Sequence, residues 1–224
     1  MNRIVTHTSC VYMVSLGHSQ HVGKSLKKDF EKLINMRFKK IDILIADTLQ
    51  AKSLIVREQD KDITRLIEDC KASGYEWENR HKDIISQLPD SKVYHWEDIT
   101  SHPNYLHYLS SVKEMYFSDD EFKNILNSSI YDYLIKAKIL EHEEKLNFDK
   151  LPVKLSIDYV LEECAAIYIQ AELGHSYLAY PNVVNPAICY ILSYKIQAHN
   201  PNLLKLIVID QKKNIERELY DVVN

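Results

Sequence analysis

The sequence predicts an α/β protein, a Rossmann-like three-layer α/β/α sandwich with a mostly parallel sheet. Short apolar runs alternate with helical stretches in the first half of the chain and again near its end. That order is typical of strand–helix–strand crossover units. The chain has 224 residues, 46% of them apolar and 27% charged, values typical of a globular protein that can bury one sizeable core. We therefore expect a single domain over residues 1–224.

Five apolar runs are expected to form the strands. The first, residues 10–15, is continuously apolar up to its serine, as in a strand buried on both faces. The other four runs are residues 41–47, 92–96, 176–181 and 203–210. Ligands of such sheets bind at the carboxyl ends of the strands. We therefore expect Ser15, Asp47 and Tyr180, each of which ends a strand, to gather at one edge.

Helices are expected in the segments between the strands. Leu26, Phe30 and Leu33 recur at helical spacing in the first of them, and Asp119 is a candidate cap for another. Gly74 is interpreted as a break between two helices. The expected helices span residues 24–36, 51–73, 77–88, 155–173 and 186–197, and the whole segment 97–173 is expected to be almost entirely helical, with one helix starting near Pro103.

The segment "VYMVSLGHSQHVGKS", residues 11–25, resembles a phosphate-binding loop. A Walker loop has four residues between its first glycine and Gly-Lys-Ser, whereas five separate Gly17 from Gly23 here. Gly23 and Lys24 are better explained as the start of a helix. The histidines of this loop lack a third ligand at a suitable spacing, so no metal site is expected.

Charge and cysteine usage narrow the classes of partner and location. The net charge of −4 argues against a globally basic nucleic-acid binder. Residues 24–40 nevertheless carry seven Lys and Arg against two acids, which fits either a solvated helix face or a site for a polyanion. No apolar segment is long enough to cross a membrane. Four scattered cysteines and the lack of a secretory signal pattern favour a cytoplasmic location.

Three segments carry candidate catalytic residues. Ser15 closes a strand just before a helix, whose N-terminus favours negative charge on a reacting oxygen. Tyr159 and Glu163 lie four residues apart on one helical stripe, and Glu163 has apolar neighbours that raise a carboxyl pKa. Tyr180 ends a strand and is followed by Pro181. Each segment taken alone also fits a capping or packing role, and Glu162 is the better candidate for a surface glutamate.

The order and spacing of these segments resemble the cyclodipeptide synthase family. The resemblance extends from residue 11 to about residue 210. It includes "RFKKIDILIADT" (37–48), "SHPNYLHYL" (101–109) and "SIDYVLEECA" (156–165). The family fold is similar to the catalytic domain of class I tyrosyl- and tryptophanyl-tRNA synthetases. Its members join the aminoacyl groups of two aminoacyl-tRNAs into a diketopiperazine, without ATP or another cofactor.

The resemblance implies a role for each matching residue. Ser15 would be the nucleophile that carries the first aminoacyl group. Tyr159 and Glu163 would hold its amino group, and Tyr180 would assist proton transfer. The residues implied to bind the substrate are Val11, Met13, Gly17, His18, Tyr105, Ala166, Leu178 and Pro181.

Three signature positions divide the family, and His18, Tyr180 and Pro181 resemble the type with Tyr-Pro in the last two. The helix that is arginine-rich in many members is diluted by acids here. We therefore expect Lys24, Lys27 and Lys28 to meet part of the tRNA. A monomer that binds neither metal nor membrane is expected.

Two other classes of function remain open at this stage. One is a nucleotide-dependent ligase or transferase on a synthetase-like fold, although the chain has no HIGH-like or KMSKS-like segment. The other is a non-catalytic helical interaction module, in which the serine, tyrosines and glutamate would be packing residues.

Overall fold

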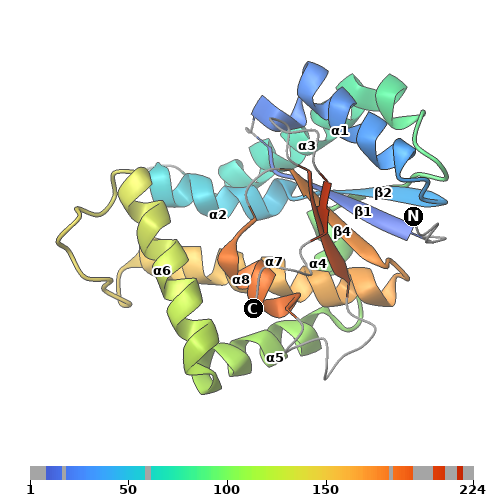
Figure 1. Cartoon of the computed structure of the whole chain (residues 1–224). Helices are drawn as coiled ribbons and strands as arrows, with labels where there is room; N and C mark the ends of the chain where they lie inside the picture. Colours follow the sequence, from blue (N-terminus) through green and yellow to red (C-terminus); the bar gives the residue numbers. More distant parts are fainter. Residues whose placement is uncertain are drawn as a thin grey trace.

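The chain folds around one mixed sheet with helices on both faces (Figure 1). The computed structural model describes residues 9–16, 19–58, 62–181, 184–193, 204–209 and 216–218. The strand order is β3-β2-β1-β4-β5-β6, and all neighbours are parallel except β5 and β6. The strands are β1 (Ser9–Val14), β2 (Lys40–Ile45), β3 (Val93–His95), β4 (Tyr177–Pro181), β5 (Lys205–Ile209) and β6 (Glu216–Glu218). The five parallel strands confirm the predicted α/β class.

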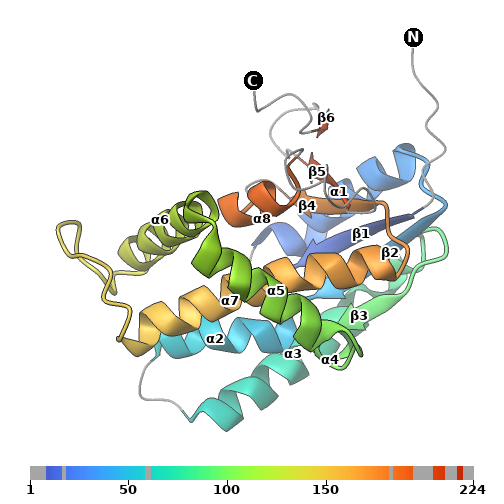
Figure 2. The same cartoon turned by 90° about the horizontal axis from the view of Figure 1, so that it is seen from below.

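Alternation along β1 divides the core between the two faces of the sheet. Val11 and Met13 belong to one apolar cluster, whereas Cys10, Tyr12 and Val14 belong to the other. Helices α1 (Gly23–Asn35) and α3 (Ile63–Ile85) pack on the second cluster, and α7 (Leu151–Glu172) packs on the first (Figure 2). The predicted three layers are therefore present.

Helix α7 lies between the sheet and α5, so most of its surface meets protein (Figures 1 and 2). Its sequence is apolar on nearly every side, which is typical of a buried helix. Pro152 lies in its first turn, where a missing N–H leaves no bond unmade. This burial fixes the direction in which Tyr159 and Glu163 point.

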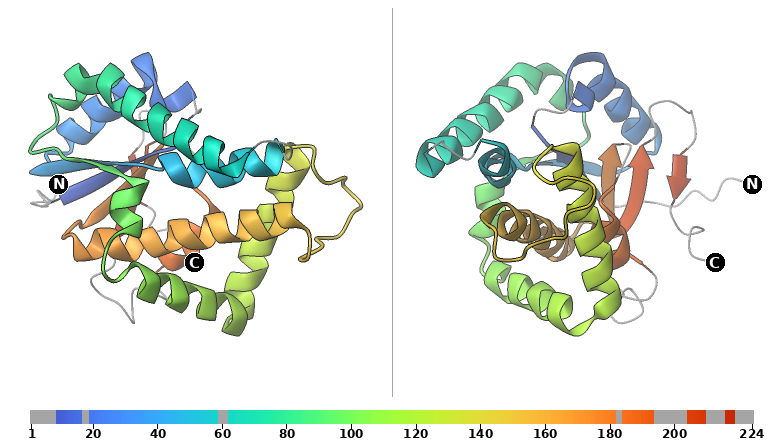
Figure 3. Two further views of the ribbon diagram at one scale, coloured as in Figure 1. Left: turned by 180° about the vertical axis from the view of Figure 1, so that it is seen from behind. Right: turned by 90° about the vertical axis from the view of Figure 1, so that its left-hand side faces the viewer.

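Of the remaining helices, α6 (Asp120–Lys136) and the C-terminal end of α2 (Asp47–Arg57) extend the molecule beyond the carboxyl ends of the strands (Figure 3). Asp119 caps α6 by accepting hydrogen bonds from the N–H groups of Glu121 and Phe122, as its position predicted. No helix in the described ranges is long and apolar enough to cross a membrane. The helices not yet given bounds are η1 (Ser19–His21), α4 (Trp96–Thr100), α5 (Tyr105–Ser118) and α8 (Pro186–Ile191).

The prediction of a helix break at Gly74 is wrong. Helix α3 continues through Gly74, and the real boundary lies between Arg57 and Ile63. A Cβ atom at Gly74 would lie 2.5 Å from Oδ2 of Asp47, so this glycine permits close packing of α2 on α3. Strand β6 was not predicted, and α8 ends at Ile191 rather than at residue 197. The rest of that predicted helix, from residue 194, lies outside the described residues.

Candidate active site

A cavity of about 530 Å³ opens at the carboxyl ends of β1 and β4, a volume typical of small-molecule sites. Helices α2, α6 and α7 form its walls. Ser15 and Glu163 are almost fully buried in it, whereas Arg57 and Lys136 are exposed at its rim. Other polar residues of the lining are Gln50, Lys52, Ser53, Ser129, Asp132, Tyr133, Ser156, Tyr159, Tyr180 and Asn185.

The backbone of Ser15 is fixed by a buried histidine of η1. The Ser15 N–H donates to Nδ1 of His21 at 2.7 Å, and the Ser15 carbonyl oxygen lies 2.9 Å from the same nitrogen. The indole N–H of Trp77 donates to the His21 carbonyl oxygen at 2.7 Å, which anchors this turn to α3. His21 therefore positions the serine, a role that its spacing in the sequence did not reveal.

Two phenols and one carboxyl group line the cavity together with Ser15. Tyr180 Oη donates to Glu163 Oε1 at 3.1 Å. Tyr159, Tyr180 and Ser15 all line the cavity, and burial followed by the nearby Glu163 carboxyl raises the pKa of each phenol. Both tyrosines therefore stay protonated at neutral pH and can donate to a reacting oxygen. The structure brings together the four residues predicted to be catalytic.

Burial makes the Glu163 carboxyl a weak acid. Glu163 is only 2% exposed. Loss of hydration raises its pKa to about 7, and the hydrogen bond from Tyr180 opposes this rise. A carboxyl group with that pKa can both take and return a proton near neutral pH.

The residues implied to bind the substrate lie in different parts of the structure. Val11, Met13, Ala166 and Leu178 are packed into the apolar core, at 2% exposure or less, and do not line the cavity. The buried Pro181 ends β4 next to Tyr180. Gly17 and His18 lie outside the described residues. The part of these residues in binding substrate remains a prediction.

Tyr105 lies behind the cavity wall rather than in it, together with Glu162. Burial, and then the adjacent Glu162 carboxylate, raises the pKa of Tyr105. Glu162 Oε1 accepts a hydrogen bond from Nζ of Lys52 at 2.5 Å, and Oε2 lies 3.4 Å from Nε1 of Trp96. Glu162 is thus partly buried and ties α7 to α2, so its interpretation as a surface glutamate is wrong.

The basic residues of the cavity differ from those predicted to bind tRNA. Lys24, Lys27 and Lys28 are exposed on α1, and none of them lines the cavity. The cavity has its own cations, on α2 and α6, which the sequence analysis did not single out as a site. Helical spacing could have found them, because Ser53 with Arg57 and Tyr133 with Lys136 each share a stripe.

Asp47 does not gather with Ser15 and Tyr180 as expected. It begins α2, where its Oδ2 lies 2.7 Å from Nδ1 of His95 and its Oδ1 accepts from the N–H of Trp96 at 3.0 Å. Its carboxylate therefore joins α2 to the end of β3. Within the described part of the chain, no three His, Cys, Asp or Glu side chains are grouped so that they could hold a metal ion.

Comparison with solved structures relates this fold to known proteins. A cyclodipeptide synthase from Fluoribacter dumoffii has a TM-score of 0.77 at 25% identity, over 90% of this chain and 89% of that one. The synthase from Candidatus Glomeribacter gigasporarum bound to Phe-tRNAPhe has a TM-score of 0.71 at 22% identity, over 94% and 90%. No family model matches the sequence, and no curated protein matches it either.

A tyrosyl-tRNA synthetase is also similar in fold. The enzyme from Archaeoglobus fulgidus, complexed with L-tyrosine, has a TM-score of 0.56 at 11% identity. The match covers 92% of this chain and 55% of the synthetase. The chain therefore has the α/β fold that cyclodipeptide synthases share with class I tRNA synthetases.

Proposed function

We propose that the protein is a tRNA-dependent cyclodipeptide synthase that works by ping-pong transfer through an aminoacyl-Ser15 ester. The observation that carries this proposal is that a buried serine, two protonated tyrosines and a buried carboxyl group line one cavity of suitable size, with a hydrogen bond from Tyr180 to Glu163. The likeness in fold to cyclodipeptide synthases, one of them bound to Phe-tRNAPhe, supports the same choice.

The first transfer needs positioning more than a strong base. An aminoacyl ester is already activated, so Ser15 Oγ can attack its carbonyl once His21 holds the serine backbone. The C–O bond to the ribose breaks, and the serine proton ends on the released ribose hydroxyl. The phenols of Tyr159 and Tyr180 lie where they can stabilise the charge that develops on the carbonyl oxygen.

The second transfer and the ring closure need an acceptor for protons. The amino group of the aminoacyl enzyme reaches the cavity as an ammonium ion, which Glu163 and Tyr159 hold. Glu163 takes its proton, and the free amine attacks the ester of the second aminoacyl-tRNA. The C–O bond to the second ribose breaks, and a further proton from the amine ends on the released ribose hydroxyl. The new terminal amine then attacks the Ser15 ester and releases the diketopiperazine. The bond from the acyl carbon to Ser15 Oγ breaks, and Tyr180 passes a proton to this oxygen. Glu163 returns a proton to Tyr180 across the 3.1 Å contact between them and takes the proton that the attacking amine loses.

Other parts of the proposal concern binding. Lys24, Lys27 and Lys28 meet tRNA phosphates away from the ester. The enzyme acts as a monomer without a cofactor, in the cytoplasm, where aminoacyl-tRNAs are made.

The direct test is to express the chain in a bacterium and search the medium for diketopiperazines by mass spectrometry. The wild type yields at least one cyclic dipeptide that the host alone does not make, and Ser15→Ala yields none. Ser118→Ala, a change at an exposed serine of α5, is the matched control and keeps full output. Well-folded wild-type protein without any cyclic dipeptide, or undiminished output from Ser15→Ala, contradicts the proposal.

A further inference from the structure

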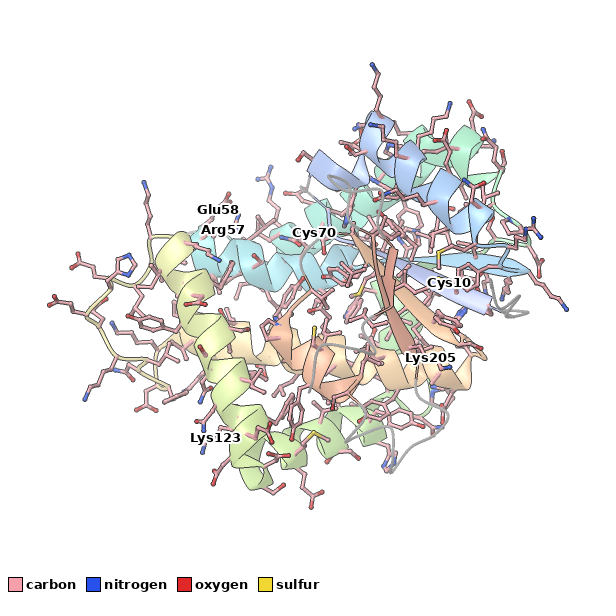
Figure 4. The ribbon with its side chains drawn as sticks, viewed as in Figure 1. Cys10, Arg57, Glu58, Cys70, Lys123 and Lys205 are labelled. Carbon is pink, nitrogen blue, oxygen red and sulfur yellow. The ribbon has the colours of Figure 1, made fainter. Side chains whose placement is uncertain are left out.

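The cavity is not uniform in charge from its buried end to its rim. The reacting groups, Ser15 and Glu163, are almost fully buried. The rim is formed where the C-terminal ends of α2 and α6 lie side by side (Figures 1 and 4), and each end carries a cation, Arg57 and Lys136. The cavity that holds Ser15 therefore has two cations in the exposed part of its lining.

Arg57 is held in place by a neutral partner. Its Nε donates to Oη of Tyr133 at 3.3 Å, and its guanidinium carbon lies 5.6 Å from the centre of the tyrosine ring. Oη of Tyr133 also lies 2.7 Å from Oγ of Ser53, which fixes the phenol on α2. Within the described residues, the two Nη groups make no hydrogen bond or ion pair. They are ready to bind an anion as a fork.

Lys136 lies at the rim with no ion pair among the described residues. Two acids are close in sequence, Asp132 one turn earlier on α6 and Glu58 next to Arg57. Neither forms an ion pair with these cations. Lys52, the third cation of the lining, differs because Glu162 already neutralises it. The rim therefore has two unpaired positive charges, which an incoming anion can meet.

We infer that Arg57 and Lys136 bind the phosphodiester that joins the last two nucleotides of the aminoacylated tRNA end. This inference rests on the proposed function. The terminal ribose carries the aminoacyl ester on one side and its 5′-phosphate on the other. When the ester lies against Ser15, the terminal nucleoside fills the cavity and the phosphate emerges at the rim.

By holding this phosphate, Arg57 and Lys136 position the ester next to Ser15 Oγ. A bidentate contact from Arg57 sets the direction of the ribose, and Lys136 adds a point charge from the opposite wall. The exposed α1 lysines cannot do this, since they do not line the cavity.

The experiment compares three substrates that differ only beyond the ribose. The wild type is first incubated with bacterial tRNA charged with a mixture of labelled amino acids, which identifies the amino acid that labels the protein. That amino acid is then supplied on intact tRNA, on adenosine 5′-monophosphate and on adenosine. The readout is the second-order rate constant of protein acylation in a single turnover.

Arg57→Ala and Lys136→Ala should each lower this constant about tenfold for the two phosphate-bearing substrates, and less than about twofold for the adenosine ester. Arg57→Lys should recover part of the loss, because it keeps the charge but not the fork. In binding of uncharged tRNA, each alanine variant should reduce the salt slope by about 1.

Lys123→Ala is the matched control, because this lysine lies on the same helix at the end away from the rim (Figure 4) and does not line the cavity. It should react like the wild type. Equal losses with all three substrates, or no loss with any, overturn the phosphate site while leaving the proposed function intact. If the variants lose only thermal stability, the two cations merely balance the C-terminal dipoles of their helices, which also overturns the inference. If none of the charged tRNAs acylates the wild-type protein, the proposed function itself is refuted.

Discussion

A buried serine lies at each end of strand β1, Ser9 as its first residue and Ser15 directly after its last, and the two serines differ in partners and surroundings. Ser15, at the carboxyl end, lines the cavity together with Tyr159, Tyr180 and Glu163. Ser9, at the amino end, lies 2.5 Å from Nδ1 of His175, whose Nε2 lies 3.3 Å from Oδ2 of Asp42.

The Ser9 cluster has the residue types of a hydrolase triad but not its access. Ser9, His175 and Asp42 are at most 7% exposed, and none of them lines the cavity that holds Ser15. Lys40 holds Asp42 from the far side at 2.8 Å, and the N–H of Lys92 donates to it at 2.8 Å. This cluster therefore fastens β1, β2 and the start of β4 together, which is a structural role.

The two clusters also respond to pH in opposite directions. Burial alone would raise the pKa of Asp42, but contacts from His175, Lys40 and the Lys92 N–H outweigh it and lower the pKa. Stability from Asp42 is thus present above its unfolded pKa and lost in acid as pH falls through the lowered value. Burial raises the pKa of Glu163 to about 7, so its contribution is present below pH 4.5 and lost as pH rises through 7. The cluster around Ser9 stabilises the charged form of Asp42, whereas burial in the cavity destabilises the charged form of Glu163.

The largest expected effect separates the two serines by activity. Ser15→Ala should lower cyclic-dipeptide formation at least about a thousandfold, equivalent to about 4 kcal/mol of barrier, because it removes the nucleophile. Ser9→Ala should change the rate less than about twofold. Product formation by purified protein with charged tRNA measures both, and equal losses from the two variants would erase the distinction.

Stability should separate the clusters in the reverse sense. Asp42→Ala should lower the free energy of unfolding by about 3 kcal/mol, because His175 and Lys40 lose a buried partner. Urea denaturation followed by circular dichroism measures this loss. Activity per folded molecule should stay near that of the wild type. A rate loss in well-folded Asp42→Ala protein would mean that the amino-end cluster takes part in catalysis.

Glu163→Gln should remove the pH response of the cavity. A pKa raised from 4.5 to about 7 corresponds to about 3 kcal/mol. The wild type should therefore lose that much stability relative to the variant between pH 4.5 and pH 8. Urea midpoints across this range test it, with Glu162→Gln as the control that retains the change. If the urea midpoints of the wild type and Glu163→Gln change with pH in the same way, the pKa of Glu163 is not raised by burial.

The kcat/KM of the wild type should also rise with pH through about 7, since the basic form of Glu163 is needed.

The smallest expected effect is that of Ser9→Ala on stability. The change removes one buried hydrogen bond to His175 and should lower the free energy of unfolding by about 1 kcal/mol. The thermal midpoint should fall by a few degrees. An increase in stability would show that the serine does not support the strand pairing.

Much of the fold was predictable because its strands are continuous apolar runs and its helices have clear periodicity. The four catalytic candidates were found because strand ends and an i, i+4 stripe have known directions. The predicted helix break at Gly74 was wrong, because a glycine is needed there for the close approach of Asp47 and not for a local turn. The tie between Lys52 and Glu162, the stacking of Arg57 on Tyr133 and the contact of His21 with Ser15 depend on tertiary packing, which periodicity does not encode.

The central claim is that Ser15, and not the similar serine at the other end of β1, carries the first aminoacyl group. Peptide-mapping mass spectrometry after acid quench of protein mixed with charged tRNA tests it most directly. One added aminoacyl group should be found on the peptide containing Ser15, should be absent in Ser15→Ala and should persist in Ser9→Ala. Cyclic dipeptide formed without any such adduct, or an adduct that persists in Ser15→Ala, would contradict it.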